Sequence, residues 1–388
     1  MMRVLTPFEL MEALVSFPTV SRDPNTDLID WVEGYLAGHG IESHRHWRDE
    51  ARTHCALFAH VGPAVAGGVV LSGHTDVVPV DGQPWTSDPY TVTERDGKYY
   101  GRGTCDMKGF DALAIWALVE AKRRGVARPL QIALSYDEEV GCTGAPAMIE
   151  AMQRVLPKAE LAIIGEPSLM KCVNGHKGGI GIATHVVGFE VHSSIMHRGV
   201  SAVMEAGKLL VWANDMNAQT MAATPTALAQ MFDPPWTNAH VGTIEGGTAN
   251  NITAKDCRFV MGFRVVPGER KEDWVARYTA RVRAVEAEMQ AVHPEARIDL
   301  APLFDVPALE PEDNGAAEAL VRRLTGDNAS HVVSYGTEAG QFQNAGYSAV
   351  ICGPGSIEQA HQPDEYIEVS EFEAGQRFME RLLAELAA

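Results

Sequence analysis

The sequence predicts an α/β protein: a mainly parallel sheet with helices on both faces, interrupted by an inserted ferredoxin-like α+β domain. Apolar strand-like runs alternate with helical segments over residues 1–177, an order typical of parallel sheets. From residue 178 the order changes to strand-helix-strand-strand-helix-strand, which is typical of a ferredoxin-like layer. The α/β alternation then resumes. We therefore expect residues 1–177 and 296–388 to form one discontinuous domain and residues 178–295 to form the inserted domain.

The elements of the first domain follow from apolar periodicity and end signals. Thr6 can cap a first helix, with Pro7 at its first position and Glu9 completing a capping box. Buried strands are expected over residues 67–72, 130–135 and 161–164, with helices over 107–124 and 144–154 between them. Near the end of the chain we expect a strand over 348–352 and a helix over 370–386.

The inserted domain shows a different alternation. Ser201 is the expected cap of a helix over residues 201–216, and a long charged helix is expected over 269–293. The stretch 217–235, rich in Pro, Thr and Ala, is expected to be an exposed loop. Strands are expected over residues 182–191, 240–244, 257–264 and, closing the layer, 296–300.

Charge and cysteine content exclude several classes of protein. The 388 residues carry 51 acidic and 32 basic side chains, a formal charge of −19, which argues against nucleic acid or an anionic membrane as the main partner. No apolar run approaches the ~18 residues of a spanning helix, and the first residues lack the apolar core of a secretion signal. The six cysteines form no Cys-x-x-Cys pair and are expected to be reduced. We expect a soluble cytoplasmic protein.

Potential metal ligands follow the predicted parallel strands. Because the carboxyl ends of such strands meet at one edge of a sheet, these side chains are expected to converge. Five carboxylates in one small volume are costly unless cations balance them, and carboxylates with two histidines suit two zinc-like ions with one bridging carboxylate. The expected set is His74, Asp76, Asp106, Glu138, Glu139, Glu166 and His361.

Spacing suggests roles within this set. His74 and Asp76 are two residues apart, so in an extended segment Asp76 can accept a hydrogen bond from the imidazole nitrogen that is not on the metal. Glu138 and Glu139 are adjacent, so they point apart in an extended segment. One can bind metal while the other acts as general base.

The ordered motifs resemble the M20 family of dinuclear zinc amidohydrolases over nearly the whole chain. The resemblance rests on SGHTDVVP at 72–79, GRG at 101–103, DMKG at 106–109, DEE at 137–139, GEPS at 165–168 and the late His361. It implies a zinc-peptidase-like catalytic domain, an inserted lid or dimerisation domain, and a homodimer. It also implies two divalent ions as cofactors, with zinc expected and cobalt or manganese as alternatives.

The resemblance also implies individual roles. Asp106 would bridge both ions, with His74 and Glu166 completing one site and Glu139 and His361 the other. Glu138 would be the general base and Asp76 the orienting partner of His74. His192 of the inserted domain would reach across a dimer to polarise the scissile carbonyl. The residues that resemble contacts to a substrate carboxylate are Asn251, Arg264, Gly336 and Thr337.

Departures from the family pattern concern the substrate side. Met196 stands where Pro is usual, Ser201 where Asn is usual and Thr253 where Pro is common, while every metal position is intact. The implied reaction is hydrolysis of an N-acyl amino acid amide, with N2-acetylornithine as the best single substrate. The alternatives are desuccinylation of succinyl-diaminopimelate, deacylation of another N-acyl amino acid, an aminopeptidase activity that fits less well, and a non-catalytic member that keeps the fold.

Other motifs favour structural roles. No Gly-x-Ser-x-Gly supports serine hydrolysis, and the segment from Gly68 to Thr75 lacks the Lys of a phosphate loop. Cys105 is expected to pack beside Asp106, and His176 to be structural. Ordinary surface or core roles are expected for His39, His44, His46, His54, His60, His185, His197, His240, His293 and His331.

Overall fold

The computed structural model describes residues 3–388 and separates into two compact units. The first contains the chain up to Gly175, Leu309–Val332 and Thr337–Ala388, and the second contains His176–Ala308 and Val333–Gly336. Residues 296–308 therefore lie with the inserted unit, whereas a boundary at residue 296 was expected. The physical reason is β13 (Arg297–Val306), which pairs along its length with β9 (Gly178–Val187).

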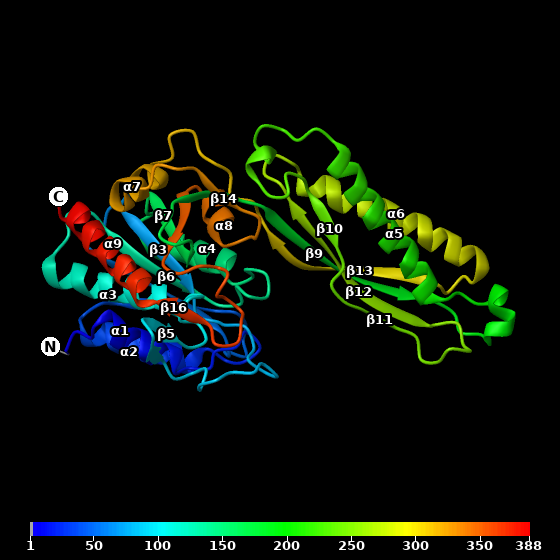
Figure 1. Ribbon diagram of the computed structural model, residues 1–388, viewed down its shortest axis with the longest axis horizontal. Helices are drawn as coiled ribbons and strands as arrows, with labels where there is room; N and C mark the ends of the chain where they lie inside the picture. The colour runs from blue at the N-terminus through cyan, green and yellow to red at the C-terminus, as the bar shows by residue number, and fades with distance from the viewer. Residues whose placement is uncertain (1–2) are drawn as a thin grey trace. The chain divides into compact units, whose positions relative to one another are not determined.

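The first unit is built on an eight-stranded sheet (Figure 1). Its middle is parallel, in the order β6 (Leu130–Ser135), β3 (Val69–His74), β7 (Leu161–Pro167) and β15 (Ser348–Gly353). These four strands are buried on both faces, which explains their near-continuous apolar sequences. The strands that extend the sheet at its two edges are β2 (Cys55–Val61), β1 (Ser43–Trp47), β8 (Val173–His176) and β14 (His331–Val333).

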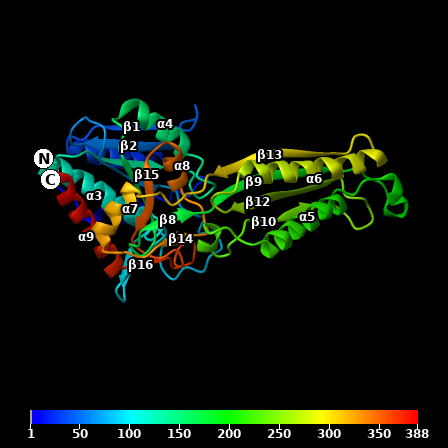
Figure 2. The ribbon, with the colours of Figure 1, turned by 90° about the horizontal axis from the view of Figure 1, so that it is seen from above.

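Helices cover both faces of this sheet (Figure 2). On one face α3 (Lys108–Arg124) and α7 (Ala316–Thr325) contact the parallel strands, and on the other α4 (Ala145–Val155) and α8 (Ala339–Asn344) do so. Helix α3 is buried from Lys108 to Ala121 because α1 (Pro7–Val15) and α9 (Val369–Ala387) pack on its outer side. The predicted α/β layer is therefore confirmed.

A small three-stranded sheet joins two loops that are far apart in the sequence. Strand β16 (Tyr366–Glu368) pairs with β5 (Lys98–Tyr100), which pairs in turn with β4 (Thr93–Arg95). This pairing brings the chain that follows His361 beside the chain that precedes Asp106.

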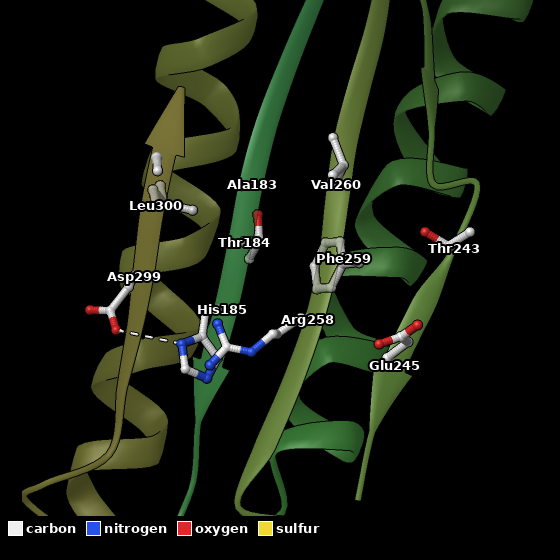
Figure 3. Close-up of a pocket in the computed structure, with 11 residues that line it drawn as sticks. Ala183, Thr184, His185, Thr243, Glu245, Arg258, Phe259, Val260, Asp299 and Leu300 are labelled. Carbon is white, nitrogen blue, oxygen red and sulfur yellow. Dashed lines mark ion pairs between the residues drawn. The ribbon is translucent and has the colours of Figure 1, made fainter. Parts of the chain in front are cut away.

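The second unit is a ferredoxin-like layer. Its sheet has the order β10 (Asn238–His240), β12 (Asp256–Val265), β9 and β13, with β11 (Ile244–Gly246) also paired to β12. Helices α5 (Ala202–Ala222) and α6 (Lys271–Val292) lie on one side of the sheet, and their apolar side chains pack on it (Figure 1). The face away from the helices is lined by polar and apolar side chains around a cavity of about 540 Å³, where His185 lies between Asp299 and Arg258 (Figure 3).

Most predicted elements are confirmed, and the differences have local causes. The capping box of Thr6 and Glu9 is present. The single strand expected over 240–244 is two strands, because the register against β12 shifts by one residue between His240 and Ile244. Helix α5 continues to Ala222, so it takes up the first part of the expected loop. Ser201 precedes α5, but its hydroxyl makes no capping hydrogen bond.

Helix α2 (Thr26–Gly38) and strands β1 and β2 were not predicted from the sequence. In residues 3–388, no helix has a stretch long and apolar enough to cross a membrane.

Candidate metal centre and active site

The predicted ligands of the first unit converge at the carboxyl ends of the parallel strands. His74 is the last residue of β3, Glu138 and Glu139 follow β6, and Glu166 is near the end of β7. Asp106 lies in the turn before α3. His361 lies in the loop between β15 and β16, which the small sheet brings beside the Asp106 turn.

Asp106 lies between the two histidines. Its Oδ1 atom is 3.0 Å from Nε2 of His74, and its Oδ2 atom is 3.2 Å from Nε2 of His361. Nε2 of His361 is also 3.0 Å from Oε2 of Glu139, and Nε2 of His74 is 3.9 Å from Oε1 of Glu166. Asp106 therefore faces one histidine with each of its oxygens, as a bridging ligand would.

Two sets of three residues each have all their ligand atoms within 4.8 Å of one another. The first consists of His74, Glu138 and Glu166, and the second of His74, Asp106 and Glu139. Glu138 is thus as close to the centre as the expected ligands are, and its assignment as base depends on its position in the family motif.

Asp76 contributes in a different way from the one expected. Nδ1 of His74 is 2.9 Å from the backbone carbonyl oxygen of Asp76, while the Asp76 carboxylate is 3.7 Å away. Strand β3 ends at His74, so the strand ladder does not set the direction of the Asp76 side chain. The Asp76 carboxylate instead accepts hydrogen bonds from the backbone N–H groups of Glu138 and Glu139.

Asp76 therefore acts at two points. Its carbonyl fixes the orientation of the His74 ring, and its carboxylate holds the segment that carries the two glutamates. Ser21 donates a third hydrogen bond to this carboxylate, at 2.6 Å. Ser21 was not singled out from the sequence, because no motif connects it to residues 55 positions away.

The carboxyl groups of the centre have strongly shifted pKa values. Burial raises the pKa of Glu138 and of Glu139 to about 7, and raises that of Glu166 well above its ordinary value. Burial also acts on Asp106, but hydrogen bonds from His361 and His74 lower its pKa below the usual range. Hydrogen bonds to Asp106 and Glu139 raise the pKa of His361 to about 10. Burial is the largest cause of the raised pKa values of the three glutamates, and repulsion from neighbouring carboxylates adds to it.

The residues of this centre fit a pair of divalent cations. Oε1 of Glu139 is buried and has no hydrogen-bond partner within residues 3–388, so it is an acceptor that a cation would satisfy. The donor set of imidazole nitrogens and carboxylate oxygens is the one that zinc and similar ions take in hydrolytic sites. His74, Asp106, Glu139, Glu166 and His361 are the residues that would hold them.

His192 and Asn251 lie side by side on the second unit. His192 precedes a short 3-10 helix (Ser193–Arg198), and the Ser193 N–H donates to the Asn251 carbonyl. Nδ1 of His192 accepts from the Ser194 N–H, so in the neutral ring the proton is on Nε2. The exposed Nε2–H is then available to donate to an external acceptor.

The neighbours of Arg264, Gly336 and Thr337 show how each of these predicted substrate contacts is placed within its own unit. Arg264 is exposed on β12 opposite Gly179, and a Cβ atom on Gly179 would lie 3.2 Å from Nη1, so this glycine makes room for the guanidinium. Gly336 belongs to the second unit and lies against Val306. Thr337 belongs to the first unit, and its buried hydroxyl accepts from the Ala339 N–H, which is a structural use of that group.

Several polar groups around the centre were missed by sequence reasoning. Glu338 is buried and accepts hydrogen bonds from Ser135 and Ser72, and burial raises its pKa to about 7. Cys142 donates through its thiol to Oε1 of Glu138, at 3.1 Å. In the sequence, the only signal for Glu338 is that it follows Gly336 and Thr337. The only signal for Cys142 is that it comes shortly after Glu138 and Glu139.

Comparisons with known proteins agree with this geometry. A family model described as Peptidase family M20/M25/M40 matches residues 70–385. The chain is 35% identical over 380 residues to a protein from Myxococcus xanthus named acetylornithine deacetylase, covering 96% of this chain and 95% of that one.

Two solved structures share the fold. One is an M20 family metallo-carboxypeptidase from Sulfolobus solfataricus, with a TM-score of 0.78, 15% identity and 99% of both chains covered. The other is a dinuclear metal-binding peptidase of the M20 family from Bacillus subtilis, with a TM-score of 0.64, 15% identity, and 98% of this chain and 97% of that chain covered.

Proposed function

This chain belongs to peptidase family M20/M25/M40 and is a metal-dependent hydrolase, and from that premise we propose that it removes the acetyl group from N2-acetylornithine. The observation that carries the chemistry is Asp106, whose two oxygens face His74 and His361 on opposite sides. The named relative favours an acetyl group over the succinyl group of the alternative substrate. The products would be acetate and ornithine.

We further propose that the centre holds two divalent ions, zinc being our choice. When bound, they would supply Lewis acidity at the scissile carbonyl and lower the pKa of a reacting water. Glu138, which Cys142 holds by a hydrogen bond, is proposed to take the proton of that water and return it to the leaving amine. His192 is proposed to donate Nε2–H to the developing oxyanion.

The substrate carboxylate is proposed to bind to Arg264, with Asn251, Gly336 and Thr337 nearby in the family pattern. A guanidinium binds a carboxylate in a bidentate manner, and the missing side chain at Gly179 leaves Arg264 room to do so. Thr337 could donate its O–H, because its hydroxyl oxygen only accepts from the Ala339 N–H.

A homodimer formed through the inserted unit is also proposed. Helix α5 exposes Val203, Met204 and Val211, and Ile244 of the neighbouring strand β11 is 45% exposed. Val203 lies next to Gly246, so these side chains form one apolar surface beside β11, which in residues 3–388 pairs only with β12. Contiguous apolar surface of this kind is typical of protein–protein contacts.

A substrate panel tests the proposed reaction. The metal-loaded protein is assayed with N2-acetylornithine, N-succinyl-diaminopimelate, N-formylmethionine and a free dipeptide, at equal concentrations. We expect acetylornithine to give the highest kcat/KM. A higher value with the succinyl substrate or with the dipeptide would contradict the assignment.

A further inference from the structure

Glu365 is a fully buried carboxylate that sequence reasoning did not assign. Its Oε1 atom accepts three backbone hydrogen bonds, from Gly103 at 3.0 Å, Cys105 at 3.0 Å and Asp106 at 3.1 Å. Its Oε2 atom accepts a 2.6 Å hydrogen bond from the buried guanidinium of Arg102. One side chain thus holds the whole turn that carries the bridging ligand Asp106.

The same cluster continues to the His361 loop. Nη2 of Arg102 donates to Oε1 of Gln83 at 2.7 Å, and Nε2 of Gln83 donates to the carbonyl oxygen of His361 at 3.1 Å. Nη1 of Arg102 is also 3.4 Å from the Gln362 carbonyl. Glu365, Arg102 and Gln83 therefore form a continuous hydrogen-bonded clamp between the Asp106 turn and the His361 loop.

The two halves of the metal centre need this clamp to different extents. His74 and Glu166 are fixed by the parallel strands that carry them and are almost fully buried. The side chain of His361 is 49% exposed, and its loop contains two non-glycine residues with positive φ, His361 at 63° and Asp364 at 54°. The loop conformation is therefore held by its contacts and not by a regular element.

We propose that Glu365 is a positioning residue that sets the separation of Asp106 from His361 and so holds the second metal position. This inference rests on the two-metal centre of the proposed function. Replacing the carboxylate by an amide leaves Arg102 buried without its counter-charge and leaves one acceptor oxygen where Arg102 and the three N–H groups use two. The ion bound by Glu139 and His361 is then weakened more than the ion bound by His74 and Glu166, because these two ligands stay fixed on their strands.

Cobalt titration of the chelator-treated protein tests this inference, with calorimetry and visible absorption as readouts. In Glu365→Gln, the first equivalent of Co²⁺ should bind within about threefold of wild type and the second about 10- to 100-fold more weakly, the range that outer-sphere partners of metal ligands usually show. Gln83→Ala, which cuts the clamp at a half-exposed residue, should weaken the second equivalent in the same direction and provides the test if Glu365→Gln does not fold.

Asp364→Asn is the matched control. It removes the same charge from the neighbouring residue, whose carboxylate binds Thr86 and does not touch the Asp106 turn. It should leave both equivalents unchanged. A folded Glu365→Gln or Gln83→Ala protein with an unchanged second equivalent, or with both equivalents weakened equally, would overturn the inference alone. Wild-type protein that takes up fewer than two ions would overturn the two-metal function as well.

Discussion

The roles of single side chains at the centre depend on where each strand ends. Glu138 and Glu139 are neighbours in the chain, yet Glu139 faces His361 and Glu138 faces His74 and Glu166. The sequence predicted that these two side chains diverge because the segment is extended, whereas Asp137 has a positive φ of 57° and a turn begins at Glu139. It could not predict how Asp76 is used, because that depends on hydrogen bonds from a loop 62 residues away.

Replacing Glu138 by Gln should abolish turnover without removing the metal. The amide keeps the shape of the side chain but cannot accept and return a proton, a function worth roughly 10²- to 10⁴-fold in rate. We expect kcat for N2-acetylornithine to fall by at least 10²-fold while elemental analysis still finds two ions. A kcat within tenfold of wild type would show that another group is the base.

His176 should make the stability of the protein depend on pH. Its ring is fully buried, and burial lowers its pKa to about 4 from an ordinary value near 6.5. The unfolded chain therefore binds a proton between pH 6.5 and 4 that the folded chain does not, so the contribution of His176 to stability is present above pH 6.5 and is lost as pH falls to 4. The expected loss is about 3 kcal/mol.

The measurement is a comparison of metal-free wild type with His176→Gln by denaturant unfolding at several pH values. Because all carboxylates are shared by the two proteins, the difference between them isolates the histidine. The stability of wild type should fall more steeply than that of the variant from pH 6.5 to 4. Parallel curves would show that His176 is not held in its neutral form.

At the scale of secondary-structure elements, strongly periodic segments were predictable and short ones were not. Helix α3 and strands β6 and β15 match their predicted ranges to within one residue at each end. Strands β4, β5 and β16 have three residues each, which is too short for a period to show. Strand β1 has the sequence SHRHW and is half-buried throughout, so it shows no apolar face. The pairing of β5 with β16 nevertheless determines where the His361 loop lies, and no local sequence pattern could reveal that pairing.

Helix capping offers a test at this scale. The Thr6 hydroxyl accepts from the Glu9 N–H at the start of α1, whereas Ser201 makes no such bond at the start of α5. We expect Thr6→Ala to destabilise the first unit by about 1 kcal/mol, and Ser201→Ala to have an effect of only a few tenths of a kcal/mol. Scanning calorimetry of both variants checks this, and equal losses would contradict the difference between the two caps.

For the whole molecule, the sequence predicted two domains and an insertion but placed the second boundary too early. The closing strand was expected to end at residue 300, whereas β13 continues to Val306 along β9. The second half of β13 contains Pro302 and a register shift between Pro302 and Phe304. Proline and irregular pairing are unusual within a strand, so this part was not predicted as one. Assembly could not be predicted from residues alone, because exposed apolar side chains are recognised only once the helix they share has been placed.

The proposed dimer is tested by charging its apolar surface. Val211 is 59% exposed on α5, and Val292, 49% exposed at the end of α6, is a matched valine outside the proposed contact. Val211→Glu should convert a dimer into a monomer because a buried carboxylate would lack a counter-charge, whereas Val292→Glu should leave the mass unchanged. Light scattering after size-exclusion chromatography measures the mass. A monomeric wild type would refute the dimer. A dimeric Val211→Glu protein would show that the dimer does not form through this surface.

The most direct test of the account is the metal content of the protein set against its turnover. Chelator-treated protein is titrated with Zn²⁺ or Co²⁺, and bound metal and acetate released from N2-acetylornithine are measured at each point. We expect no turnover without metal and a rise to full activity as about two ions bind per chain, with Asp106→Ala binding neither and remaining inactive. Full activity in the metal-free protein, or two tightly bound ions in Asp106→Ala, would contradict it.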